Sequence, residues 1–144
     1  MSDLAYLRTS DGFTPADLDL DDLVGFFKGW PNAPSAQQHR RLLSSSDYAV
    51  VARDGRHGPV VGFATAIADG VLAAYIPLLE VLPSHRGHGI GSALIEHLLA
   101  DLADYYMVDL VCDPDLADFY KPLGFQPAHA MITRRYHHQS GITP

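Results

Sequence analysis

The feature that most constrains this chain is a glycine-rich stretch in its middle, L-P-S-H-R-G-H-G-I-G at residues 82–91. An apolar run ends at Pro83, three glycines follow at alternate positions, and the sequence then takes on the periodicity of a helix. Glycines at this point leave the amides of the first helical turn open, and those amides have no partner within the helix. Together with the positive end of the helix dipole, they favour binding of a large anion such as a pyrophosphate.

The spacing of this stretch differs from the two common nucleotide-binding loops. A P-loop has Lys before Ser or Thr, whereas Ser92-Ala93 follows the last glycine here. The dinucleotide fingerprint has its third glycine one position later than Gly91. Simple turn chemistry is therefore an open alternative to an anion site on these residues alone.

Composition limits the function classes further. The 144 residues suit a single domain over residues 1–144, and a net charge of -7 argues against a nucleic-acid partner. With one cysteine, Cys112, no internal disulfide can form, so we expect a cytoplasmic protein. No stretch is apolar enough to predict a membrane span, and the first residues do not resemble a signal peptide. The eight histidines are scattered without the spacing of a metal site, so no metal is expected.

The first part of the chain predicts a short strand at residues 5–8 and two helices. The first helix would begin with Thr14 as its N-cap and Pro15 in its first turn, and would end by Gly29. Its buried face would consist of Leu20, Leu23, Val24 and Phe27, which follow a spacing of i, i+3, i+4, i+7. A capping box over residues 35–38 opens the second helix.

The remaining elements predict a sheet covered by helices. Three β-rich runs, at residues 48–53, 60–68 and 73–82, are separated by turn residues and so predict antiparallel hairpins. Pro77 cannot donate to a ladder, which predicts a bulge in the third of these strands. There follow a helix over 94–102, a strand over 106–112, a short helix over 115–121, and one or two strands after residue 125, including 130–136. The fold class expected is α/β (α+β), a mixed, mostly antiparallel sheet of six or seven strands with about four helices.

Two motifs resemble the GCN5-related N-acetyltransferase superfamily. Arg86-x-x-Gly89-x-Gly91 is similar to the R/Q-x-x-G-x-G/A signature of that family, and the strand before it ends in the matching run Leu79 to Pro83. The segment F-Y-K-P-L-G-F at residues 119–125 resembles a second family motif, F-Y-x-x-L-G-F. The resemblance covers roughly residues 48–136. Two positions depart from it, because Asp113 and Leu116 stand where the family often has Asn and Ala.

The resemblance implies that acetyl-CoA is the cosubstrate and lies in a splay between the fourth and fifth strands. Its pyrophosphate would lie on the amides after Arg86, and its pantetheine arm along the backbone of Leu79 and Val81. The cofactor-binding residues implied in this way are Leu79, Val81, Arg86, Gly87, His88, Gly89, Ile90, Gly91 and Ser92.

The resemblance also suggests the groups that carry the chemistry. Tyr120 matches the tyrosine that gives a proton to the departing thiolate. Glu80 could hold or deprotonate the amine, but a role as an exposed glutamate or a partner of Arg86 is an equal alternative. Trp30 and Tyr75 could line the acceptor pocket, although aromatic residues at such positions also serve as core.

These residues predict an acetyl-CoA-dependent N-acetyltransferase that transfers the acetyl group directly to a primary amine of a small molecule or peptide. A homodimer is possible, since dimers are frequent in this family. Two alternatives are a non-catalytic acyl-CoA-binding sensor or interaction domain, and a nucleotide-binding protein that uses the same glycines.

Overall fold

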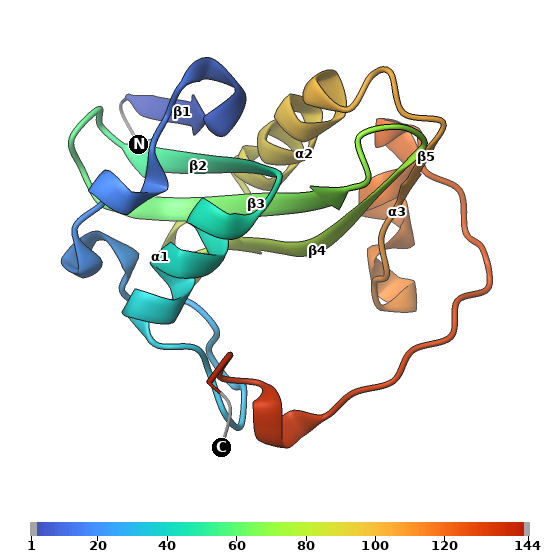
Figure 1. Cartoon of the computed structure of the whole chain (residues 1–144). Coiled ribbons are helices and arrows are strands. Elements are labelled where there is room, and N and C mark those ends of the chain that lie inside the picture. Colours follow the sequence, from blue (N-terminus) through green and yellow to red (C-terminus); the bar gives the residue numbers. More distant parts are fainter. Residues whose placement is uncertain (1–2, 143–144) are drawn as a thin grey trace.

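The protein is described here by a computed structural model that covers residues 3–142. Its centre is a five-stranded sheet in the order β1-β2-β3-β4-β5, in which β1 to β4 are antiparallel and β5 is parallel to β4. The strands are β1 (Leu4–Arg8), β2 (Tyr48–Asp54), β3 (Val60–Ala68), β4 (Ala73–Val81) and β5 (Met107–Asp109). The helices are α1 (Ala36–Ser45) and α2 (Ile90–Asp101), which cover opposite faces of the sheet, and the short α3 (Ala117–Tyr120) (Figure 1). None of the helices within these residues has the length and apolar character needed to cross a bilayer.

Alternation along the strands divides the buried side chains between two cores. In β2, Val50 and Ala52 belong to the cluster under α2, whereas Ala49 and Val51 belong to the cluster under α1. This is the period of two that a strand imposes, with apolar residues on both of its sides because both faces of the sheet are covered. The central strands and the helix after the glycines therefore agree with their predictions.

The hairpins form where the turn residues predict them. At the β2–β3 turn the amide of Asp54 donates to the carbonyl of Pro59 at 3.0 Å. At the β3–β4 turn a single side-chain oxygen, Asp69 Oδ1, accepts from the amides of residues 71, 72 and 73 at 2.7 to 3.1 Å. Both turns thus supply acceptors for amides at the ends of the strands that they join.

The predicted irregularity at Pro77 and the predicted splay between β4 and β5 are both confirmed. The register between β3 and β4 shifts between Thr65 and Ile67, opposite the proline. Strand β4 pairs with β5 only from Ala73 to Tyr75, so its second half runs on to Val81 without β5 beside it. The parallel pair thus opens into a gap along the edge of β4, on the side where the glycine loop begins.

The predicted first helix is wrong. In its place lie two short 3-10 turns, Pro15–Asp17 and Leu20–Leu23, and Thr14 makes no side-chain cap. Gly25 and Phe27 have φ angles of 98° and 61°, which no continuous right-handed helix can include. Leu23 and Phe27 are buried as predicted, but Leu20 is 37% and Val24 66% exposed. Tight turns bury enough of these side chains against the sheet, so tertiary packing overrides the helical spacing.

Helix α1 begins as the capping box predicts, but only half of the box forms. Ser35 Oγ accepts from the amide of Gln38 at 3.1 Å. The side chain of Gln38 does not return to the cap; its Nε2 donates to the carbonyl of Gly141 at 2.9 Å. The N-terminal end of α1 is therefore joined to the C-terminal segment of the chain.

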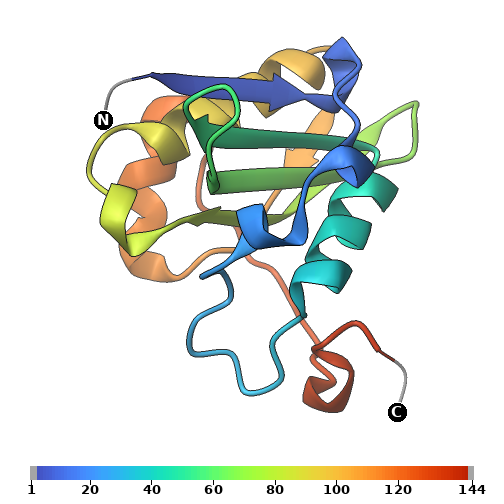
Figure 2. The ribbon, with the colours of Figure 1, turned by 90° about the vertical axis from the view of Figure 1, so that its left-hand side faces the viewer.

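The predicted strands after Phe125 are wrong, and the predicted strand over 106–112 shortens to β5. Residues 126–135 contain no strand; they cross the molecule from α3 to the N-terminal end of α1, as both ribbon views show (Figures 1 and 2). There the amide of Asn32 donates to Gln139 Oε1 at 2.8 Å. A half-buried strand needs alternation, whereas Met131-Ile132 and Arg134-Arg135 are like pairs whose members would face opposite sides. The described residues thus hold five strands and three α-helices, not six or seven strands and four helices.

The core under α1 contains a buried histidine that predicts a pH-dependent stability. His39 is 1% exposed and its ring lies 4.3 Å from that of Phe63, and within residues 3–142 neither of its ring nitrogens has a hydrogen-bond partner. Burial lowers the pKa of His39 from 6.5 to about 4. Between these values the unfolded chain binds more protons, so the free energy of unfolding should fall by up to about 3 kcal/mol from pH 7 to pH 4.

Urea unfolding of the His39→Phe variant at several pH values measures this contribution. Phenylalanine fits among the neighbouring rings and does not titrate, so the variant should lose that part of the slope between pH 6.5 and 4. The exposed His57 provides the control, since His57→Gln should keep the wild-type slope. An unchanged slope in His39→Phe would contradict the assignment.

Candidate active site

The glycine loop presents a row of free amides at the start of α2. After a 3-10 turn at Pro83–His85, the chain reaches Gly89, the N-cap of α2, and the first helical hydrogen bond runs from the Ala93 amide to the Gly89 carbonyl at 3.1 Å. Within residues 3–142, the amides of residues 87 to 92 donate no hydrogen bond. Such amides at a helix N-terminus need an acceptor from outside the chain, and a pyrophosphate offers several.

The three glycines of the loop do not share one role. Gly87 and Gly89 have φ angles of 79° and 80°, and a Cβ on either would meet nothing within 4 Å. They supply both the left-handed conformation and an open approach. Gly91 differs, because a Cβ there would lie 3.3 Å from Phe119 Cζ and 3.8 Å from Val81 Cγ2. Gly91 thus permits close packing of α2 between β4 and α3. The sequence had suggested that it keeps the approach of a ligand open, as Gly87 and Gly89 do.

Side chains on both sides of the loop hold its backbone. Arg86 Nε donates to the carbonyl of Val81 at 3.1 Å. His85 Nε2 lies 3.0 Å from Asp54 Oδ2, and its Nδ1 lies 2.8 Å from Ser84 Oγ. His85 therefore ties the loop to the β2–β3 hairpin, and the exposed His88 is the histidine left at the mouth of the loop.

Glu80 lies on the opposite face of β4 from Leu79 and Val81. Those two pack on the α2 side, whereas Glu80 Oε1 accepts from the amide of Phe27, on the α1 side, at 3.0 Å. Phe27 is the non-glycine residue of the described chain with positive φ, and this conformation accompanies its bond to Glu80. The second oxygen, Oε2, is buried and has no partner within residues 3–142.

The environment of Glu80 suits a proton acceptor. Burial raises the pKa of its carboxyl group, and the bond from Phe27 and the charge of Arg86 oppose this rise. A raised pKa brings a carboxylate closer to neutral pH and makes it a better base. Arg86 makes its hydrogen bond to the backbone of Val81 and not to Glu80, so the alternative of a direct Glu80–Arg86 pair is not seen.

Tyr120 is buried on the other side of the sheet. It ends α3 and packs edge-on against Phe119 at 4.8 Å and Phe125 at 5.7 Å between ring centroids. Burial, and secondarily the nearby Cys112, raises the pKa of its phenol above 10, so Tyr120 keeps its proton at neutral pH. Its hydroxyl makes no hydrogen bond within the described residues, which leaves it free to donate.

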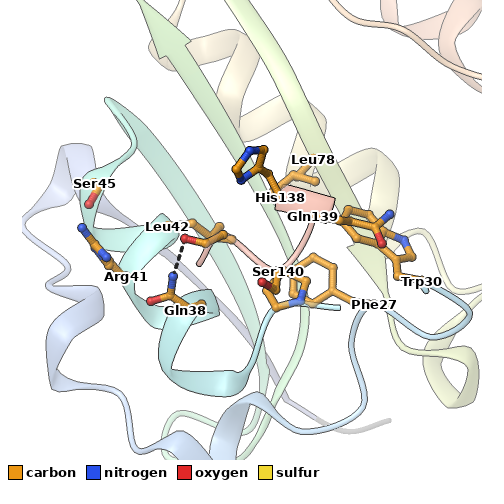
Figure 3. Close-up of a pocket in the computed structure, with 12 residues that line it drawn as sticks. Phe27, Trp30, Gln38, Arg41, Leu42, Ser45, Leu78, His138, Gln139 and Ser140 are labelled. Atoms are coloured by element: carbon orange, nitrogen blue, oxygen red, sulfur yellow. Dashed lines mark hydrogen bonds between the residues drawn. The ribbon is translucent and has the colours of Figure 1, made fainter. Parts of the chain in front are cut away.

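Trp30 and Tyr75 line cavities on the α1 side of β4. One cavity of about 450 Å³ lies between α1, β4 and the C-terminal segment, and is lined by Phe27, Trp30 and Leu78 among others (Figure 3). A neighbouring cavity of about 480 Å³ shares Trp30 and Leu78 and adds Tyr75. Glu80 is not itself a lining residue, but Leu78 is two residues from it on the same face of β4, and Phe27, which lines the first cavity, donates its amide to Glu80.

Sequence reasoning missed the C-terminal contribution to these cavities. Residues 138–141 line the first and residues 134–136, 138 and 139 line the second. These residues reach the cavities because the chain after Phe125 crosses to α1. The prediction of a strand over residues 130–136 placed them in the sheet instead. The adjacent charged pair Arg134-Arg135 argues against a half-buried strand, because one of the two arginines would face the core.

The sheet with its splay, the free amides and the two motifs define an acetyltransferase fold, and the comparisons with known proteins agree. The chain belongs to the GNAT family of acetyltransferases, whose family model matches residues 9–125. It is similar to GCN5-related N-acetyltransferase 1, chloroplastic, of Arabidopsis thaliana, with 34% identity over 82% of this chain and 59% of that protein. Serotonin N-acetyltransferase 2, chloroplastic, of rice is 40% identical over 84% of this chain and 60% of that protein.

Solved structures give the same result for the fold. A Deinococcus radiodurans protein assigned as an acetyltransferase superposes with a TM-score of 0.86 and 45% identity, covering 99% of this chain and 96% of that one. An aminoglycoside N-acetyltransferase solved with CoA superposes with a TM-score of 0.63 at 19% identity, covering 92% of this chain and 94% of that one. The chain spans about half to three fifths of the length of the curated relatives it matches.

Proposed function

We propose that this chain is an N-acetyltransferase that moves an acetyl group from acetyl-CoA directly to a primary amine. The single observation that carries the proposal is the row of six amides from Gly87 to Ser92 that have no acceptor within the described residues. The residues present fit a pyrophosphate, because the amides are free and a Cβ at Gly87 or Gly89 would meet only open space. Family membership and the splay beside Leu79 and Val81 support a CoA thioester as the donor.

The proposed chemistry uses the two faces of the sheet. The amine nitrogen forms a bond to the acetyl carbon while the bond between that carbon and sulfur breaks. Glu80, on the α1 side, accepts the proton that the amine loses, and Tyr120, on the α2 side, donates a proton to the departing sulfur. The open edge of β4 beyond Tyr75 is the place where groups from both faces can approach one another.

The acceptor is proposed to be a small molecule or a peptide with an apolar or aromatic part. Phe27, Trp30, Tyr75 and Tyr136 give the two cavities an aromatic lining. The rice relative is named for serotonin, an arylalkylamine, so amines of this kind are the first candidates to test.

A thiol-release assay with DTNB tests the proposed function. Acetyl-CoA plus an amine panel that includes tryptamine, tryptophan and lysine-containing peptides should release free CoA, with reactions lacking amine as the blank. Tight acetyl-CoA binding without thiol release on any amine would contradict the enzyme and support the acyl-CoA sensor. Thermal protection by ATP or NAD but not by CoA would indicate a nucleotide-binding protein.

Glu80→Gln is expected to lower kcat/KM for the amine about 30-fold while the Kd of acetyl-CoA changes less than about twofold. The glutamine Oε1 can still accept from the Phe27 amide, so the loop keeps its geometry and only the proton acceptor is lost. The chain has one other glutamate, Glu96, which is exposed on α2, and Glu96→Gln provides the matched control. Equal activity of the two variants would remove Glu80 from the mechanism.

We also propose that the chain forms a homodimer. The support is an exposed apolar pair on the segment that crosses the molecule, with Met131 fully exposed and Ile132 58% exposed. Sedimentation velocity measures this association.

A further inference from the structure

The two cavities that share Trp30 and Leu78 carry a charge opposite to that of the whole chain. The sequence has 17 acidic residues against 10 Lys and Arg. Yet the charged side chains among the described residues that line the cavities are all basic: Arg41 in the first, and Arg134 and Arg135 in the second. No carboxylate is among the described lining residues of either cavity.

The three arginines differ from the arginines that hold the fold. Arg8 and Arg53 form ion pairs with Asp101 and Asp22 at 3.0 and 2.9 Å. Within residues 3–142, Arg41, Arg134 and Arg135 form no ion pair with a carboxylate, and Arg134 donates only to the carbonyl of its neighbour Thr133. Their guanidinium groups are therefore available to a ligand. Arginine is the side chain best shaped to bind carboxylate or phosphate oxygens in pairs.

The position of these arginines separates them from the pyrophosphate site. Tyr75, which lines the cavity with Arg134 and Arg135, precedes Val81 by six residues of β4, a separation of about 20 Å along an extended strand. The free amides of the glycine loop lie beyond Val81. The basic groups thus lie away from the glycine loop, in the cavities that Trp30 lines, on the same face of the sheet as Glu80.

We propose that the acceptor is an amine that also carries an anionic group, a carboxylate or a phosphate, which Arg134 and Arg135 bind with help from Arg41. This inference rests on the proposed acetyl transfer and narrows its substrate class. The aromatic lining holds the body of the molecule, and the arginines bind its anion. The amine is thereby directed toward Glu80 at the side of the cavity.

Binding of product pairs tests the proposal without requiring turnover. Titration calorimetry at low salt would compare N-acetyl-5-carboxytryptamine with N-acetyltryptamine, which differ by one carboxylate on the ring, at the end of the molecule away from the amine nitrogen. The wild type should bind the acid at least about tenfold more tightly. The same comparison of N-acetylserotonin phosphorylated on its ring oxygen with N-acetylserotonin tests phosphate as the anion, and the pair with the larger ratio identifies the anion that the site takes.

The double variant R134Q/R135Q should reduce the carboxylate preference to about twofold and leave the affinity for N-acetyltryptamine unchanged. Arg56, exposed in the β2–β3 turn, provides the control, and R56Q should behave as the wild type. Equal binding of both members of each pair by the wild type, or an equal loss of preference in R56Q, would overturn the proposal. Acetylation of tryptamine with no preference for either anion would overturn this inference alone, whereas a clear preference without thiol release on any amine would contradict the proposed function alone.

Discussion

Replacing Gly89 by glutamate is expected to weaken acetyl-CoA binding at least about 100-fold. Gly89 is the N-cap of α2 and lies among the six free amides, with open space where its side chain would be. A carboxylate at this position would occupy that space and place a negative charge where the pyrophosphate is to bind. Its own oxygens could also accept from the amides that the ligand needs. Titration calorimetry with acetyl-CoA and with CoA measures the loss.

The chain offers a closely matched control for this variant. Gly70 has the same φ of 80° and also has nothing within 4 Å of a Cβ, but it lies in the β3–β4 turn. Gly70→Glu therefore imposes the same backbone strain and adds the same charge away from the loop. It should bind acetyl-CoA as the wild type does. If Gly89→Glu binds as well as Gly70→Glu, the loop does not hold the pyrophosphate and the proposed chemistry loses its basis.

The second large effect is expected from Tyr120→Phe, which should lower kcat about 100-fold or more and change the Kd of acetyl-CoA less than about twofold. The ring can keep its contacts with Phe119 and Phe125, and the hydroxyl has no protein partner among the described residues to leave behind. The fold should therefore persist while the proton donor is lost. Steady-state kinetics with the thiol-release assay, together with calorimetry, separate the two quantities.

Tyr6→Phe controls for the loss of a phenol as such. Burial raises the pKa of Tyr6 as it does that of Tyr120, but Tyr6 lies on β1 at the opposite edge of the sheet, against His97. Tyr6→Phe should keep full activity. Wild-type turnover in Tyr120→Phe would remove the acid role and leave the departing thiolate to take its proton from water.

Local patterns predicted the middle of this protein well, because each of its elements depends on neighbours in the chain. The hairpin residues from Tyr48 to Val81 place turn formers between alternating runs, and the strands form where those runs lie. The glycine loop and α2 follow from the same kind of signal. The two motifs on these elements were enough to indicate the family, and the family model matches residues 9–125 of the chain.

The outer segments depended on contacts that no short pattern contains. Residues 14–29 have the spacing of a helix, but the surface of the sheet accommodates Leu23 and Phe27 from tight turns, and the Phe27 amide finds its acceptor in Glu80, 53 positions away. The C-terminal residues lie away from the sheet and are joined instead to Asn32 and Gln38, by hydrogen bonds that span more than 100 positions of the chain.

The sequence by itself therefore predicted the proposed donor site, since its free amides, glycines and strand are consecutive. Only the tertiary structure decided the proposed acceptor site, since it set Glu80 beside Phe27 and brought Trp30, Arg41 and C-terminal residues around two neighbouring cavities. The physical reason is that a backbone anion site is a local property of one turn. A side-chain cavity exists only where distant segments pack together. The free energy that holds those segments together comes from burial of apolar surface throughout the domain, which no short stretch of sequence contains.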